Sequence, residues 1–170
     1  ASDVIAVGAM GHVLHFDGQR WAEVPSKLHA SFYGVWSGGK AHAVLVGQFG
    51  VVMQWDGQAL TQLRDKGEHL YGVWGSSKTD IVAVGRKGTI LRFSGKHWAT
   101  ENGAGSNDLY AVWGDGKTYV AVGRSGVAFK STGAAWTTLT TGTGSSLRGV
   151  WGSSASDIWM VGDKGTVLRH

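Results

Sequence analysis

Histidine and carboxylate side chains are the groups in this sequence that could bind a metal or transfer protons. The chain has 170 residues with seven His, twelve Asp and Glu together, and no Cys, which excludes disulfides and thiolate metal sites. Only His12 and His15 lie at a short spacing, and residues three apart on a strand point to opposite faces. The sequence therefore predicts no metal site and no cofactor.

The carboxylates recur at matching places rather than in a cluster. Asp3, Asp80 and Asp157 each begin a short β-branched run, which indicates a structural role in which each accepts backbone N–H bonds from the preceding loop. A glycosidase needs two carboxylates facing one sugar, and a serine hydrolase needs a nucleophile motif with a histidine partner. Neither set is visible, so we predict that the protein is not an enzyme and has no catalytic residues. The three Glu all lie in or after expected outer strands: Glu23, Glu68 and Glu101.

The elements that position these residues repeat along the chain. Trp36, Trp74, Trp113 and Trp151 are spaced by 38, 39 and 38 residues. A glycine recurs with the same period at positions 8, 47, 85, 123 and 162, and a second glycine follows each of them by three residues. A period near 38 over the whole chain is typical of a repeat architecture. The repeats span about 1–31, 32–69, 70–108, 109–146 and 147–170 in a single domain.

Each repeat reads as four short strands. In the third repeat we expect an inner strand at 70–74, two middle strands at 80–85 and 89–93, and an outer strand at 97–101, with a loop at 75–79. The middle strands are joined by a Gly-x-x-Gly turn, and a phosphate-binding loop is excluded because a strand, not a helix, follows. Four-stranded antiparallel units of this length predict an all-β fold, a β-propeller, in which the four periodic Trp pack between neighbouring sheets.

The first and last repeats are incomplete. The first lacks an inner strand and the last lacks an outer strand, which gives 18 strands in all. Two interpretations stay open: a five-bladed ring with two three-stranded blades, or a piece of a larger propeller that closes by association. An exposed incomplete blade favours pairing with another copy, so a homo-oligomer is expected under the second interpretation.

A resemblance to a known family supports this architecture. The segment GVWGSSASDIWMVGDKGTVLRH at 149–170 resembles the repeats of bacterial β-propellers found in secreted or surface proteins of myxobacteria. It is more distantly similar to Asp-box and photosystem-assembly propellers. The resemblance covers essentially the whole chain and implies the fold and a secreted or cell-surface location. It implies no particular activity, because members of that group differ in function.

Surface recognition is the function class that remains. The formal net charge is +4, but the basic residues are scattered, so we expect no nucleic-acid partner. No apolar run approaches the length of a membrane span. Trp21, Trp98 and Trp136 lie on outer strands and are expected to be partly exposed, and Trp55 departs from the repeat pattern. These four could stack on sugar rings.

A basic rim is expected at one end of the propeller. The turns between the middle strands carry Arg86, Lys87, Arg124 and Lys164, and these turns should lie beside the loops that join repeats. Together with the Trp residues they form the candidate ligand-binding set. We therefore predict a non-catalytic binding module with repeated, lectin-like sites for glycans. The alternative is a scaffold for protein–protein interactions that self-assembles through its incomplete blades.

Overall fold

The computed structural model describes residues 3–101, 105–133 and 135–170. Within these ranges the chain forms 18 strands arranged in five antiparallel sheets. The second, third and fourth sheets have four strands each, and the first and fifth have three. The first sheet contains β1 (Val4–Val7), β2 (Val13–Phe16) and β3 (Trp21–Glu23). The second contains β4 (Phe32–Ser37), β5 (Ala43–Gly47), β6 (Val52–Trp55) and β7 (Leu60–Arg64).

The remaining sheets repeat this pattern. The third contains β8 (Leu70–Ser77), β9 (Asp80–Gly85), β10 (Ile90–Phe93) and β11 (Trp98–Glu101). The fourth contains β12 (Leu109–Gly114), β13 (Tyr119–Gly123), β14 (Ala128–Ser131) and β15 (Trp136–Thr138). The fifth contains β16 (Leu147–Ser154), β17 (Asp157–Gly162) and β18 (Val167–Arg169). The β-propeller fold and its incomplete first and last blades are confirmed.

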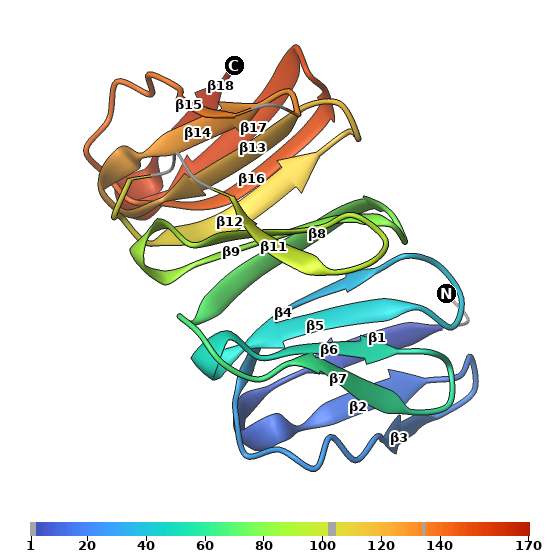
Figure 1. The fold of residues 1–170 in the computed structure, drawn as a ribbon. Coiled ribbons are helices and arrows are strands. Elements are labelled where there is room, and N and C mark those ends of the chain that lie inside the picture. Colours follow the sequence, from blue (N-terminus) through green and yellow to red (C-terminus); the bar gives the residue numbers. More distant parts are fainter. Residues whose placement is uncertain (1–2, 102–104, 134) are drawn as a thin grey trace.

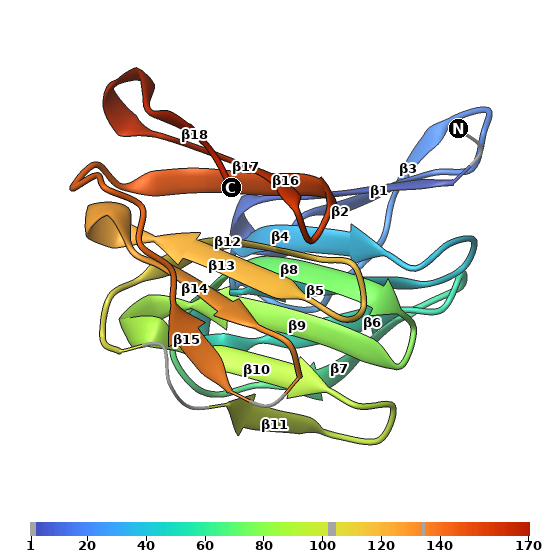
Figure 2. The ribbon, with the colours of Figure 1, turned by 90° about the horizontal axis from the view of Figure 1, so that it is seen from above.

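The sheets form an arc. In Figure 1 they follow one another from the first, at the bottom, to the fifth, at the top. In Figure 2 the first and fifth sheets lie on one side and the outer strand β11 of the third sheet lies on the other. The inner strands β4, β8, β12 and β16 contact one another in sequence along the inside of this arc. The first and fifth sheets are therefore the two ends of the arc.

The core lies between the sheets because a strand in the middle of such a stack presents apolar side chains on both faces. In β9, Ile81 and Ala83 pack toward the second sheet, whereas Val82 and Val84 pack toward the fourth. All four are fully buried, at 1% exposure or less. At ~25 cal/mol per Å², burying one such aliphatic side chain contributes about 1.5–3 kcal/mol, so each internal interface between sheets is a large part of the stability.

The turn between the middle strands recurs in nearly identical form in all five sheets. The turn between the middle strands is a three-residue 3-10 segment: η1 (Ala9–Gly11), η2 (Gln48–Gly50), η3 (Arg86–Gly88), η4 (Arg124–Gly126) and η5 (Asp163–Gly165). Its central residue, which we call the tip residue, has a left-handed φ between 54° and 58° in all five repeats: Met10, Phe49, Lys87, Ser125 and Lys164. The glycine that follows also has positive φ, which explains why glycine recurs there.

One expected boundary was wrong. We expected a loop at 75–79, but β8 continues to Ser77 and pairs with Asp80, which leaves only Lys78 and Thr79 in the turn. The fifth sheet has the same tight connection between Ser154 and Asp157. Glycine and serine at this place therefore extend the inner strand rather than end it.

Candidate functional site

In three of the five sheets, an Asp at the start of the first middle strand, or directly before it, binds a basic side chain on the second middle strand. The pairs are Asp3–His15 at 2.6 Å, Asp80–Arg92 at 2.7 Å and Asp157–Arg169 at 2.9 Å. We expected these Asp residues to accept N–H bonds from the preceding loop. For Asp80 and Asp157 that expectation was wrong, because their partners are side chains. The residues before Asp3 lie outside the described part of the chain, and the backbone N–H that Asp3 accepts there comes from Ala41 of the next sheet. The structural role itself recurs at each position.

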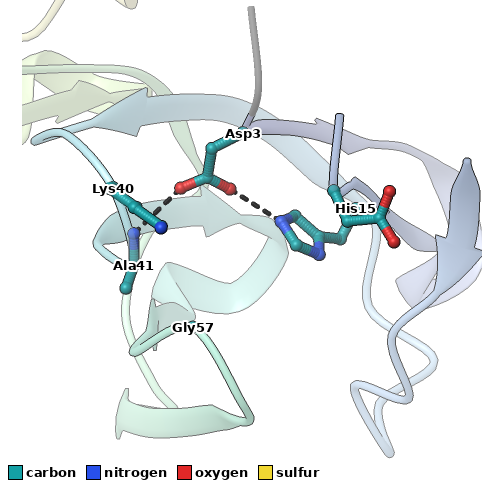
Figure 3. Close-up of a pocket in the computed structure, with 6 residues that line it drawn as sticks. Asp3, His15, Lys40, Ala41 and Gly57 are labelled. Atoms are coloured by element: carbon teal, nitrogen blue, oxygen red, sulfur yellow. Dashed lines mark hydrogen bonds and ion pairs between the residues drawn. The ribbon is translucent and has the colours of Figure 1, made fainter. Parts of the chain in front are cut away.

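The first of these pairs borders a small open hollow between the first and second sheets (Figure 3). Asp3 accepts a 2.9 Å bond from the Ala41 N–H and pairs with His15 through its other oxygen. The Ala41 bond, followed by the His15 bond, holds the pKa of Asp3 below its usual value. Lys40 and Asp17 also line the hollow. Among the described residues around it there is no Ser, Thr or Cys nucleophile, and we assign the pair the same structural role as its two counterparts.

A buried polar cluster joins the third and fourth sheets. Tyr119 is completely buried, its hydroxyl donates to Asp80, and the Arg92 guanidinium lies 4.7 Å from the centre of its ring. Burial, and then the bond to Asp80, raise the pKa of Tyr119 to about 12. On the outer side of this interface the Trp136 indole donates a 2.6 Å bond to Glu101. These contacts fix the relative position of two neighbouring sheets.

The periodic Trp residues show how one sheet packs against the next. A Cβ added at Gly75 would lie 2.6 Å from the Trp36 ring, and one at Gly152 would lie 2.9 Å from the Trp113 ring. Trp74 donates a 2.7 Å bond to the carbonyl oxygen of Gly114. At Gly75 and Gly152 an indole of the preceding sheet therefore lies in space that a larger residue would occupy, whereas Trp74 is held by its hydrogen bond to the following sheet.

The fourth periodic Trp corrects our expectation. Trp151 is 58% exposed and does not lie between two sheets. Trp159, Val161 and Val167 are exposed beside it, although the residues at the same places in the third sheet are fully buried. The outward face of the fifth sheet is therefore an uncovered apolar surface, which we define by these four residues.

The first sheet has an uncovered face of its own. Leu14 and Trp21 are exposed and Phe16 is half-buried, whereas the matching Leu91, Phe93 and Trp98 of the third sheet pack against the second sheet. Val4 and Ala6 lie on the same face. The two ends of the arc thus present opposite faces of one kind of sheet.

The residues proposed from sequence for ligand binding do not form one site. Trp21 is exposed and Trp98 is half-buried, but Trp136 and Trp55 are only 5% and 4% exposed, so the expected partial exposure of Trp136 was wrong. Outer-strand position does not determine exposure, because Trp136 packs into the interface with the third sheet. The sequence analysis also missed Tyr33, Tyr71 and Tyr110, which lie on the inner strands with neighbouring ring centres 5.7 and 5.9 Å apart.

The basic turn residues lie at one end of the propeller, as expected from the repeat. Their backbone N–H groups bond to the loops that join repeats, as in Arg86 to His69 and Arg124 to Asp108, both at 2.8 Å. Arg86, Lys87, Arg124 and Lys164 are exposed. Glu68 pairs with Lys87 at 2.8 Å and lies 3.9 Å from Arg86, and its pKa is lowered chiefly by the Lys87 bond. The rim is therefore partly neutralised.

Neither metal-binding clusters nor membrane-spanning helices are present in the part of the chain that the structure describes. No group of three or more His, Cys, Asp or Glu residues is arranged to hold an ion there. The same residues contain no helix long and apolar enough to cross a bilayer.

Comparison with known proteins places the fold among solved propellers. No protein-family model and no curated protein matches the chain. The solved structure described as YCF48 bound to D1 peptide superposes with a TM-score of 0.71 at 20% identity, over 98% of this chain and 60% of that one. YCF48 from Cyanidioschyzon merolae gives a TM-score of 0.70 at 14% identity, over 100% of this chain and 67% of that one. The likeness agrees with the photosystem-assembly part of the sequence resemblance at the level of fold.

Proposed function

We propose that the protein is a propeller scaffold that binds protein through the uncovered sheet faces at the ends of its arc. The proposal rests on a comparison between two sheets of the same chain. The outward face of the fifth sheet repeats the outward face of the third sheet, and in the third sheet that face is covered by another sheet of the same chain. A surface of this chemistry matches a protein β-sheet because the molecule itself uses it that way.

The match extends to polar groups as well as apolar ones. Trp151, Ser153, Asp157 and Arg169 of the fifth sheet correspond to Trp74, Ser76, Asp80 and Arg92 of the third. In both sheets the serine donates to the Asp at 2.7 Å and the arginine binds the same carboxylate. In the third sheet a neighbour adds the Tyr119 hydroxyl to Asp80 and the Gly114 carbonyl to Trp74. In the fifth sheet the corresponding Trp151 and Asp157 have no neighbouring sheet that supplies such partners.

A second copy of the chain is the partner we propose for this face. The uncovered face of the first sheet carries Val4, Ala6, Leu14, Phe16 and Trp21, at the places of Ile81, Ala83, Leu91, Phe93 and Trp98 of the third sheet. In the third sheet those residues pack against the outward face of the second. Contact between the fifth sheet of one copy and the first sheet of another would repeat this internal interface, without the inner strand that the first sheet lacks. Such head-to-tail contacts are heterologous.

The comparisons support a protein partner more than a sugar. One solved propeller of similar fold is described as bound to a peptide, which supports the same class of ligand here. Lectin-like sugar binding, our first interpretation, has less support because two of its four Trp residues, Trp55 and Trp136, are buried. Only Trp21 offers an open indole face among those four, and it lies on the face proposed for protein contact.

Light scattering coupled to size-exclusion chromatography tests the proposal over a range of concentrations. We expect a species larger than the 18.0 kDa chain that the double variant Trp151→Ser/Trp159→Ser reduces to the single chain. Leu14→Ser/Trp21→Ser should have the same effect in a head-to-tail assembly. Phe49→Ser is the matched control, because Phe49 is equally exposed but lies on a turn. A single-chain mass at every concentration, together with specific binding on a glycan array, would replace this proposal with the lectin one.

A further inference from the structure

The outer strands of neighbouring sheets meet at two equivalent places that differ in chemistry. Glu101 ends β11 and Arg64 ends β7, and each pairs with the first residue of the strand before it. Between the third and fourth sheets, Glu101 accepts a 2.6 Å bond from the Trp136 indole. Between the second and third sheets the matching indole is Trp98, and an arginine side chain has no acceptor to offer it.

The Trp98 indole nitrogen is consequently left without a partner. Its Nε1 atom is buried and makes no hydrogen bond to the described residues, although Trp98 begins β11 just as Trp136 begins β15. Buried donors without acceptors are uncommon in folded proteins, because nothing compensates for their lost hydration. The junction of the second and third sheets therefore contains a donor that an oxygen atom from a ligand would satisfy.

An open hollow of about 310 Å³ lies at this junction. We call it the basic hollow, and it is lined by Leu63, Arg64, Phe93, Lys96, His97 and Trp98. The ring centres of Phe93 and Trp98 are 5.4 Å apart and form its apolar part. Its other part carries three basic side chains, one at the end of β7 and two in the turn before β11. The hollow thus combines positive charge with aromatic surface.

The charges of the basic hollow are not neutralised within the described part of the chain. Neither Arg64 nor Lys96 forms an ion pair with a carboxylate there, in contrast to Lys87, which pairs with Glu68. The Arg64 Nε donates a 3.0 Å bond to the Lys66 carbonyl oxygen, which anchors the guanidinium without using its Nη groups. An anchored, unpaired guanidinium is well suited to bind an anion.

We propose that the basic hollow binds a carboxylate side chain of an acidic protein segment. This carboxylate takes the place that Glu101 takes between the third and fourth sheets. One of its oxygens accepts from the Trp98 indole and the other pairs with Arg64 in a charge-assisted bond. The precedent inside the molecule is a glutamate at the end of a β-strand, which favours a protein segment over a free anion.

Entry of the carboxylate requires a small local movement. The Trp98 Nε1 atom is buried, so a side chain of the hollow must turn aside before the ligand reaches it. Leu63 lines the hollow and is 41% exposed, which gives it room to turn. The site goes beyond the proposed assembly, because neither uncovered sheet face contributes a residue to it.

NMR of the indole N–H groups in the full chain tests the inference. The probe is acetyl-Glu-Leu-Glu-amide, and acetyl-Gln-Leu-Gln-amide is the uncharged control of equal size. The Trp98 signal is assigned by its loss in Trp98→Phe. We expect saturable binding of the acidic peptide, a downfield shift of the Trp98 signal as its hydrogen bond forms, and no shift with the control. Assembly through the sheet faces is measured separately by molar mass, so either proposal can fail without the other.

Variants assign the binding to individual side chains. Arg64→Gln should weaken binding of the acidic peptide about tenfold, and Lys96→Ala about threefold, as for an exposed ion pair. Lys117→Ala, an exposed lysine on a turn of the fourth sheet, is the matched control and should change nothing. Arg64→Glu should supply the missing acceptor from within the chain, so the Trp98 signal shifts downfield without peptide and peptide binding is lost.

Three results would overturn the inference. The first is a Trp98 signal that does not move with the acidic peptide at millimolar concentration. The second is binding that survives both Arg64→Gln and Lys96→Ala in folded protein. The third is a shift of the Trp98 signal with inorganic phosphate while the acidic peptide has no effect, which would make the hollow a phosphate site. If Arg64→Gln does not fold, Lys96→Ala on the exposed turn decides alone.

Discussion

Replacing Tyr119 by Phe isolates the polar part of one interface between sheets. Tyr119 is completely buried, and its hydroxyl donates to Asp80 and lies 3.1 Å from the Ser76 hydroxyl. Phe keeps the buried ring and its contact with the Arg92 guanidinium, so only the hydrogen bonds are lost. A hydrogen bond to a charged group contributes ~1.5–3 kcal/mol. Because Asp80 retains Ser76 and Arg92, we expect the free energy of unfolding to fall by about 2 kcal/mol.

The measurement is urea denaturation followed by tryptophan fluorescence, with circular dichroism as a second probe of the same transition. Tyr33→Phe is the matched control, because that ring is half exposed. Its free energy of unfolding should change by less than ~0.5 kcal/mol. Equal effects of the two variants at neutral pH would refute the assignment of the Tyr119 hydroxyl as a stabilising donor.

The pH dependence of the same pair gives a second test. Burial raises the pKa of Asp80, but the bonds from Tyr119, Ser76 and Arg92 together outweigh it and lower the pKa below 3.8. The stabilisation from ionised Asp80 is therefore present above pH 3.8 and is lost as the pH falls through the lower folded value. The difference between the wild-type chain and Tyr119→Phe should accordingly shrink in strong acid.

At alkaline pH the stabilisation is lost as the pH rises, because the titrating group is then the Tyr119 hydroxyl. The pKa of Tyr119 rises from 10.0 to about 12 on folding, so its contribution is complete below pH 10 and is lost as the pH rises toward 12. A difference of that size corresponds to about 3 kcal/mol. The Phe variant should not show this loss between pH 10 and 12, and an identical alkaline profile for both proteins would contradict the raised pKa.

Two further predictions concern the packing of the periodic Trp residues between sheets. Gly75→Ala should lower the free energy of unfolding by ~1–3 kcal/mol because its Cβ would lie 2.6 Å from the Trp36 ring. The control is Gly8→Ala, whose Cβ would meet no atom within 4 Å. Equal thermal midpoints for the two variants would contradict the close contact between Trp36 and Gly75. Trp113→Ser should cost ~3–5 kcal/mol, whereas Trp151→Ser, at the same repeat position but exposed, should leave the single chain nearly unchanged. Chemical denaturation of dilute protein measures this difference, and similar losses would mean that Trp151 is covered.

The period of the sequence was enough to predict the strands, the sheets and the missing inner and outer strands. The prediction succeeded because side-chain alternation along a strand and glycine at a turn are local requirements, and the sequence shows both in each of the five repeats. The strand boundary at Ser77 was missed because Gly and Ser are typical of loops, while here Gly75 is needed as the seat of Trp36.

The candidate surfaces were harder to predict, since they depend on what lies opposite a residue. Trp151 has the same local sequence as Trp74, but its exposure depends on whether a following sheet covers it. Trp136 was misjudged for the converse reason, because Glu101 of the preceding sheet binds its indole. The alignment of Tyr33, Tyr71 and Tyr110 along the inner strands was not predicted, because a β-bulge such as that at Tyr71 comes from a shift in pairing, which residue types alone do not reveal.

The turns at one end of the propeller carry a consequence for engineering. Their five tip residues are as different as Met10, Phe49, Lys87, Ser125 and Lys164, yet all share one backbone conformation. The tip side chain is exposed in all five repeats, so the tip can vary in chemistry among residues that tolerate its positive φ. Tip side chains could therefore be exchanged among repeats, avoiding β-branched residues that disfavour positive φ, to reprogramme the chemistry of that end with the packed interior left intact.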